Sequence, residues 1–90
     1  MHFEWDARKA RENFRKPAVW FKEASSVFFD PVSATGDDPD DSVGERRRVT
    51  LGVSSSGRLL VVAHAERGDA IRIISARRGR RAERKVYEES

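Results

Sequence analysis

The sequence predicts a single α+β domain in which two N-terminal helices cover one face of a small, mainly antiparallel sheet of three or four strands, and a C-terminal helix follows. Three observations predict it. Two stretches near the N-terminus have helical patterns, three later stretches alternate apolar and polar residues as strands do, and the last stretch is again helical in propensity. No internal repeat divides the chain, so residues 1–90 are expected to form one domain.

The N-terminal third is predicted to be a short strand followed by two helices. Residues 2–5 ("HFEW") alternate in character, and Asp6 then stands where an N-cap belongs. The helix over 7–16 is expected to end before Pro17, because proline excludes the preceding residue from the α region. A second helix is predicted over 20–30, where apolar residues recur with helical spacing at Trp20, Phe21, Ala24, Val27 and Phe28.

The rest of the chain is predicted to be a loop, three strands and a short helix. Residues 32–44 are polar and centred on "GDDPDD", which indicates a solvated loop or a short edge strand. Its acidic residues lack calcium-loop spacing, so no metal site is expected there. Strands are expected over 46–54, 58–66 and 70–77, separated by turn residues, and a helix over 80–90.

Composition narrows the classes of function. The chain has no cysteine, which excludes disulfides and a thiolate zinc site, and no cofactor is implied. No apolar run approaches the roughly 20 residues that span a bilayer, and the N-terminus lacks the apolar region of a signal peptide, so a cytoplasmic protein with no membrane association is expected.

Charge is distributed unevenly along the chain. Residues 1–45 hold 6 Lys and Arg against 10 Asp and Glu, whereas residues 46–90 hold 12 against 5, which gives balances of −4 and +7 within a net charge of +3. A basic half predicts a polyanionic partner such as RNA or DNA. The alternative is a solvated surface on which the two halves neutralise each other.

The loop of the last hairpin decides which side chains share a face, because a shift of one residue moves every side chain to the other face. A two-residue loop, Gly68-Asp69, mixes charges with aliphatic residues on both faces. A three-residue loop, Arg67-Gly68-Asp69, pairs His64 with Arg72. It also collects an apolar face from Leu59, Val61, Ala63, Ala65, Ile71 and Ile73. The sequence therefore favours the three-residue loop.

This register predicts a polar cluster on the open face of the sheet. His64, Glu66 and Arg72 would lie together there, and by alternation Arg48 and Thr50 could join them. An imidazole and a carboxylate can transfer protons, and arginines can stabilise the charge that develops on a phosphate. These are the parts of a metal-independent ribonuclease, although a structural or merely exposed histidine and glutamate fit the same pattern.

Three segments closely resemble the BrnT family of toxins from bacterial type II toxin–antitoxin modules. They are "FEWDARKARENFRK", "FKEASSVFFDP" and "GRLLVVAHAERGDAIRIISARRGRRAERKVYEE", and they cover nearly the whole chain. The resemblance implies a RelE-like fold and a toxin that cleaves RNA and arrests growth. It further implies a BrnA-type antitoxin with a ribbon-helix-helix domain, so that only the toxin–antitoxin complex would bind DNA.

The resemblance also implies roles for individual residues. Proton transfer is expected from His64 or Glu66, and phosphate stabilisation from Arg72 and Arg77. Among the expected RNA contacts, Arg67, Ser75 and Tyr87 match family positions, whereas Lys16, Arg48 and Arg78 are expected to contact phosphates through their charge. Two of these have alternatives: Ser75 as a small residue that lets a helix approach, and Tyr87 as a ring buried against the sheet.

One segment departs from the family pattern. Relatives commonly have Lys-His-Gly between the first two helices, and this chain has Lys16-Pro17-Ala18. Two interpretations stay open. Lys16 is sufficient there as a phosphate contact, or the chain is a catalytically weakened toxin homologue that acts mainly as the antitoxin's partner in promoter autoregulation.

Overall fold

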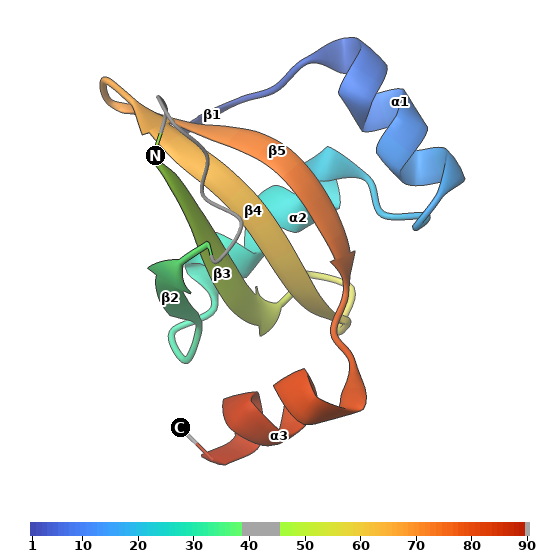
Figure 1. Ribbon diagram of the computed structural model, residues 1–90, viewed down its shortest axis with the longest axis vertical. Coiled ribbons are helices and arrows are strands. Elements are labelled where there is room, and N and C mark those ends of the chain that lie inside the picture. Colours follow the sequence, from blue (N-terminus) through green and yellow to red (C-terminus); the bar gives the residue numbers. More distant parts are fainter. Residues whose placement is uncertain (39–45, 90) are drawn as a thin grey trace.

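The computed structural model describes residues 1–38 and 46–89, and in these ranges it contains five strands and three α-helices (Figure 1). In chain order they are β1 (His2–Glu4), α1 (Ala7–Arg15), α2 (Phe21–Ser25), the 3₁₀ turn η1 (Ser26–Phe29), β2 (Ala34–Asp37), β3 (Arg47–Val53), β4 (Leu59–Arg67), β5 (Ala70–Arg78) and α3 (Arg81–Glu89). The predicted α+β class is confirmed. The polar stretch contains a short edge strand, β2, while the acidic residues at 39–45 lie outside the described residues.

The sheet has the strand order β1-β5-β4-β3-β2 and is mixed. Strand β1 runs parallel to β5, with His2 opposite Ala70, and the other three strand pairs are antiparallel. The predicted count of three or four strands is therefore wrong: three of the four strand pairs are antiparallel, but the parallel pair with β1 makes this five-stranded sheet mixed. The alternating pattern of residues 2–5 indicates a strand, but nothing in that local pattern specifies a partner almost 70 residues away.

The hairpin between β4 and β5 has the two-residue loop, so the three-residue prediction is wrong. Arg67 pairs with Ala70, and the turn glycine has a φ of 62°. Glycine in the first position of a two-residue loop suits the twist of a hairpin. In this register His64 lies opposite Ile73, and Arg72 lies opposite a different residue of β4.

The buried face of β4 is consequently the opposite of the predicted one. A bulge between Ala63 and His64 shifts the pairing, and Val61 and Ala63 face the open side of the sheet. The core packs α1, α2 and η1 against the other face through Ala10, Val19, Phe21, Ala24, Val27, Leu60, Val62, Ile73 and Ala76. Figure 1 shows α2 behind the strands and α3 apart from both other helices. The open face is thus free to form a site.

Helix α1 begins as the sequence predicts. The Asp6 carboxylate accepts hydrogen bonds from the backbone N–H groups of Arg8 (2.8 Å) and Lys9 (3.1 Å), which satisfies two donors of the first turn. These bonds hold the pKa of Asp6 below its usual value. The helix ends at Arg15, directly before the Lys16-Pro17 segment.

The side chain of Asn13 joins α1 to the edge of β5. Its amide nitrogen donates to the carbonyl oxygens of Val19 (2.8 Å) and Ala76 (2.9 Å), and its amide oxygen accepts from the Ala76 N–H (3.2 Å). Strand β1 pairs only with Ala70 to Arg72, so at Ala76 the amide of Asn13 occupies the position of a neighbouring strand. This contact places the end of α1 beside the open face.

Glu23 of α2 anchors the turn between β3 and β4. Its carboxylate accepts hydrogen bonds from Arg58 Nε (2.9 Å), from a terminal nitrogen of Arg58 and from the hydroxyls of Ser54 and Ser56. The Arg58 guanidinium, followed by the serine hydroxyls, lowers the pKa of Glu23 to about 2, against the opposing effect of burial. The carboxylate therefore stays charged well below the pH at which an ordinary glutamate takes up a proton.

Stability should fall as the pH drops from about 4.5 towards 2, because Glu23 has a lower pKa in the folded chain than in the unfolded one. The contribution of a depressed carboxyl is present above its unfolded pKa and is lost as the pH passes through its folded pKa. We expect Glu23→Gln to cost about 2 kcal/mol at pH 7 and to flatten this slope, measured by urea unfolding at several pH values. Glu12→Gln, at the exposed Arg8–Glu12 pair, is the control. If stability falls with pH just as steeply in Glu23→Gln as in the unaltered chain, the lowered pKa of Glu23 is not the cause of this slope.

Candidate active site

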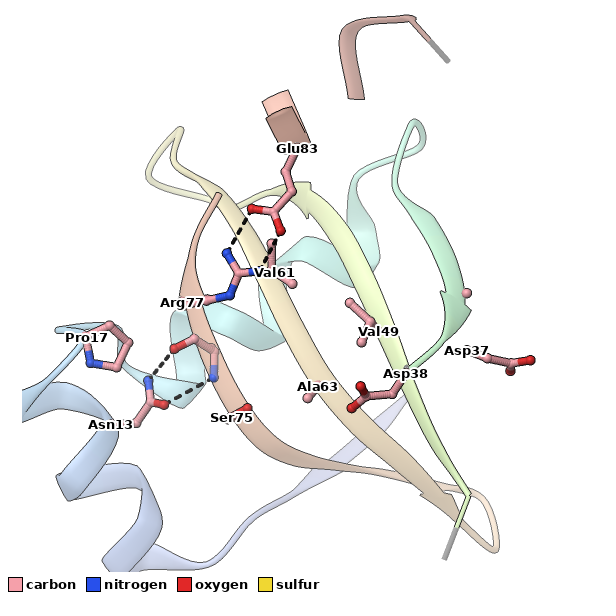
Figure 2. Close-up of a pocket in the computed structure, with 12 residues that line it drawn as sticks. Asn13, Pro17, Asp37, Asp38, Val49, Val61, Ala63, Ser75, Arg77 and Glu83 are labelled. Atoms are coloured by element: carbon pink, nitrogen blue, oxygen red, sulfur yellow. Dashed lines mark hydrogen bonds and ion pairs between the residues drawn. The ribbon is translucent and has the colours of Figure 1, made fainter. Parts of the chain in front are cut away.

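The open face of the sheet carries a cavity of about 670 Å³ (Figure 2). Its floor comes from the small and apolar residues Val49, Val61 and Ala63 of β3 and β4. Polar groups surround this floor: Asn13, Asp37, Asp38, Ser75, Arg77 and Glu83. Among the described residues that line the cavity, Arg77 is the one cation.

Glu83, from the first turn of α3, fixes the guanidinium of Arg77. The two side chains meet as a fork-to-fork pair, with Nη1 donating to Oε1 (2.8 Å) and Nη2 donating to Oε2 (2.5 Å). Oε1 also accepts from the backbone N–H of Arg80 (2.7 Å), as the third residue of a helix does in a capping box. The Arg77 hydrogen bonds, opposed by burial, lower the pKa of Glu83 to about 2, and the pKa of Arg77 is raised.

This arrangement gives Arg77 a defined plane at the edge of the cavity. A planar guanidinium matches the oxygens of a phosphate as well as those of a carboxylate. Nη1 also donates to the carbonyl oxygen of Arg78 (3.2 Å), so an entering phosphate must use Nε, use the second N–H of Nη2, or displace the carboxylate. An anion that enters the cavity can therefore bind at Arg77, where it competes with the carboxylate of Glu83.

His64 does not lie in this cavity. It is 3% exposed on the helix-covered face, where Phe28 contacts its ring edge to face at 4.8 Å. Its Nε2 is 2.8 Å from the Thr50 hydroxyl, which in turn is 2.7 Å from Thr35 Oγ1, so three side chains form a hydrogen-bonded chain. Burial, and then the charge of Arg48, lower the pKa of His64, which favours a neutral imidazole at pH 7.

The predicted cluster of His64, Glu66 and Arg72 on one open face is wrong. Arg72 lies opposite Ala65, one residue out of phase with His64 and Glu66, so its side chain leaves from the other face. There Arg72 Nη1 is 3.1 Å from the carboxylate of Glu4 on the neighbouring strand β1. The expected catalytic roles of these three residues stay predictions, but no shared site supports them.

Arg48 and Glu66 lie at one end of the helix-covered face. Together with Arg46 they line a smaller cavity of about 280 Å³. The expectation that Arg48 and Thr50 share a face with His64 is confirmed, but that face is the helix-covered one. Arg48 Nε is 3.9 Å from the carboxylate of Asp37.

Of the residues expected to bind RNA, Ser75 lies beside Arg77 in the larger cavity (Figure 2). Lys16 and Arg78 are exposed outside it, and Arg67 is 3.9 Å from Glu4. Tyr87 donates a hydrogen bond from its hydroxyl to Asp30 (2.6 Å), a contact that neither of the two alternatives for this ring anticipates. The RNA-binding roles stay predictions.

Three residues that line the cavity are not among the site residues expected from the sequence: Asn13, Asp38 and Glu83. Asn13 carries a signal, because asparagine is a weak helix former and here precedes a helix end by only a few residues. Glu83 carries no such signal, because the residue three positions earlier is Arg80 and not the serine or threonine of a capping box. Asp38 lies in a run of acidic residues, and the sequence does not single it out.

The described residues, 1–38 and 46–89, contain no group of three or more histidine, aspartate or glutamate side chains that could hold a metal ion. In the same ranges no helix is long and apolar enough to cross a membrane.

The open face of this small α+β fold thus carries a cavity in which one guanidinium is held in plane by a carboxylate. The family model of BrnT, the ribonuclease toxin of type II toxin–antitoxin systems, matches residues 5–83. The chain therefore belongs to the BrnT family of ribonuclease toxins, whose partner in a type II system is a protein antitoxin. No curated protein matches the chain.

Proposed function

We propose that this chain is an endoribonuclease that cleaves RNA by metal-independent transesterification in the cavity on the open face of the sheet. The BrnT family makes it a ribonuclease toxin. The observation that supports this particular site is the guanidinium of Arg77, the one cation among the described cavity residues. We further propose a cytoplasmic protein that arrests growth and is neutralised by a BrnA-type ribbon-helix-helix antitoxin encoded beside it, with DNA bound only by the complex.

The chemistry requires an anion-binding group and a base. The 2′-hydroxyl attacks the adjacent phosphorus, a bond from phosphorus to the 2′-oxygen forms, and the bond to the 5′-oxygen breaks. Arg77 would stabilise the negative charge that builds on the phosphate oxygens during this step. The products are a 2′,3′-cyclic phosphate and a 5′-hydroxyl, whose leaving oxygen takes up one proton.

Asp38 is the carboxylate best placed to accept the proton of the 2′-hydroxyl. It is 9% exposed, and Figure 2 shows it directed into the cavity from the side opposite Arg77. Asp37 points away from the cavity in the same view, and Glu83 is engaged with Arg77. A carboxylate on one side and a guanidinium on the other would bracket a bound phosphodiester.

Metal removal tests this mechanism. Purified chain incubated with single-stranded RNA should cleave it equally fast with and without EDTA, and the fragments should carry 2′,3′-cyclic phosphate ends, read by mass spectrometry. The reason is that the proposed step uses protein groups alone. Cleavage that EDTA abolishes, or fragments with 5′-phosphate ends, would contradict the mechanism.

A second candidate is a weakened toxin that acts mainly with its antitoxin in promoter repression. One observation favours it: Glu83 occupies the guanidinium of Arg77, the cation that the proposed cleavage needs. This candidate would be favoured if RNA stays intact after incubation with the purified chain while the toxin–antitoxin complex still represses the promoter.

A further inference from the structure

The helix-covered side of the molecule exposes an aromatic surface that the cavity of the proposed site does not use. It consists of Phe14, Trp20 and Phe29, which are 41%, 48% and 66% exposed. Trp20 and Phe29 line a second hollow of about 820 Å³, whose other walls come from α2, η1 and the turn between β3 and β4. Burying such aromatic side chains is a main source of binding energy at protein interfaces.

Two of the three rings stack on each other. Phe14 and Trp20 have centroids 3.7 Å apart and planes inclined by 13°, so each ring already has one covered face. Phe29 contacts Phe3 edge to face, with ring centroids 6.1 Å apart. Stacking with RNA bases requires open ring faces, of which this pair has lost half, whereas a hollow bordered by aromatic rings suits aliphatic and aromatic side chains of a protein.

Cations flank this surface. Lys22 lines the hollow, Arg11 lies one turn before Phe14 on α1, and Arg15 lies one turn after Arg11. None of these three makes an ion pair with any residue that the structure describes, whereas the acidic residues nearby, Glu12 and Glu23, are each paired with an arginine. The net charge offered to a partner is therefore positive, which opposes self-association and favours an acidic partner.

We propose that Phe14, Trp20 and Phe29, with Arg11, Arg15 and Lys22 around them, dock an acidic amphipathic segment of the antitoxin. Its apolar side chains would enter the hollow, and its carboxylates would meet the three cations. This inference rests on the proposed function for the identity of the partner. It implies that the antitoxin holds the toxin from the helix-covered side, away from the cavity that contains Arg77.

Titration calorimetry with purified chain and the purified antitoxin encoded beside it tests this docking. Trp20→Ser and Phe29→Ser should each weaken binding at least about 30-fold, as central aromatic contacts do. The double variant Arg15→Glu/Lys22→Glu should weaken it about tenfold and reduce its dependence on salt, with no change in the core. The control Val86→Ser removes an apolar side chain that is 60% exposed on α3, and it should change binding less than about threefold.

Four outcomes would overturn the docking surface. In the first, Trp20→Ser, Phe29→Ser and the charge-reversal variant all bind the antitoxin within threefold of the unaltered chain. In the second, the unaltered chain does not bind the antitoxin, which would also refute the proposed partner. In the third, a labelled single-stranded RNA loses affinity for Trp20→Ser while the antitoxin does not. In the fourth, light scattering shows a dimer of the chain that Trp20→Ser dissociates.

The ribonuclease proposal fails by a different measurement. If the unaltered chain leaves RNA intact while Trp20→Ser and Phe29→Ser lose the antitoxin as expected, the docking surface stands and the catalytic proposal is refuted. If the unaltered chain cleaves RNA and both variants bind the antitoxin normally, the catalytic proposal stands and the docking surface is refuted. Circular dichroism of each variant, compared with that of Val86→Ser, separates lost docking from lost folding.

Discussion

Arg77→Ala is expected to lower the rate of RNA cleavage by about 100- to 1,000-fold, the usual effect of removing one group that stabilises charge in the transition state. Arg77 supplies the cation of the cavity, and its removal leaves Glu83 as an unpaired carboxylate facing the incoming phosphate. Two effects then act in the same direction: lost attraction and added repulsion. The measurement is single-turnover cleavage of a short RNA with enzyme in excess.

Two variants sharpen this test. Arg77→Lys retains the charge but loses the planar fork, so its rate should fall between those of Arg77→Ala and the unaltered chain. Arg84→Ala removes an arginine of α3 outside the cavity, and it should leave the rate nearly unchanged. If Arg77→Ala cleaves RNA as fast as Arg84→Ala does, the scissile phosphate does not bind at this guanidinium.

Asn13→Ala should destabilise the fold by roughly 3–5 kcal/mol, because it leaves three buried backbone groups without partners at once. These groups are the carbonyl of Val19 and both the N–H and the carbonyl of Ala76. For a chain of this length the midpoint of thermal unfolding should drop by roughly 15 °C or more. Differential scanning calorimetry would measure it.

Asn13→Asp distinguishes hydrogen bonding from packing. An aspartate has nearly the same shape and can still accept from the Ala76 N–H, but it cannot donate to either carbonyl, so it should be about as harmful as alanine. Ser25→Ala removes an exposed hydroxyl that bonds only within its own helix, and it should cost less than about 1 kcal/mol. A stable Asn13→Asp variant would show that the amide contributes volume rather than hydrogen bonds.

Local signals predict most elements of this fold. Asp6 begins α1 because its carboxylate can cap the helix, and Pro17 follows shortly after its end, both as expected. The predicted helix over 20–30 is a five-residue α-helix followed by a 3₁₀ turn, because the two serine hydroxyls at its centre bond to backbone carbonyls one turn earlier. Strand partners and register depend instead on contacts between distant segments.

The hairpin register shows why the expected site could not be predicted. Separation of charged from aliphatic residues on the two faces favours the three-residue loop, which would place His64 in solvent. The structure buries His64 with a hydrogen bond from or to Thr50, so its presence in the core is compatible with the two-residue loop. The bulge beside it adds a further shift that alternation alone cannot reveal. Arg77 and Ser75 both line the cavity, because they lie two residues apart on one strand.

The parallel pairing of β1 with β5 affects how the toxin folds during its synthesis. During synthesis the N-terminal strand has no neighbour until residues 70–72 emerge, and the amide of Asn13 has none until Ala76 does. Folding then requires contacts between segments far apart in sequence, which form slowly. Half of the residues that line the cavity come from the same late segments, β4, β5 and α3. A nascent chain thus carries no assembled nuclease while most of it is still being translated.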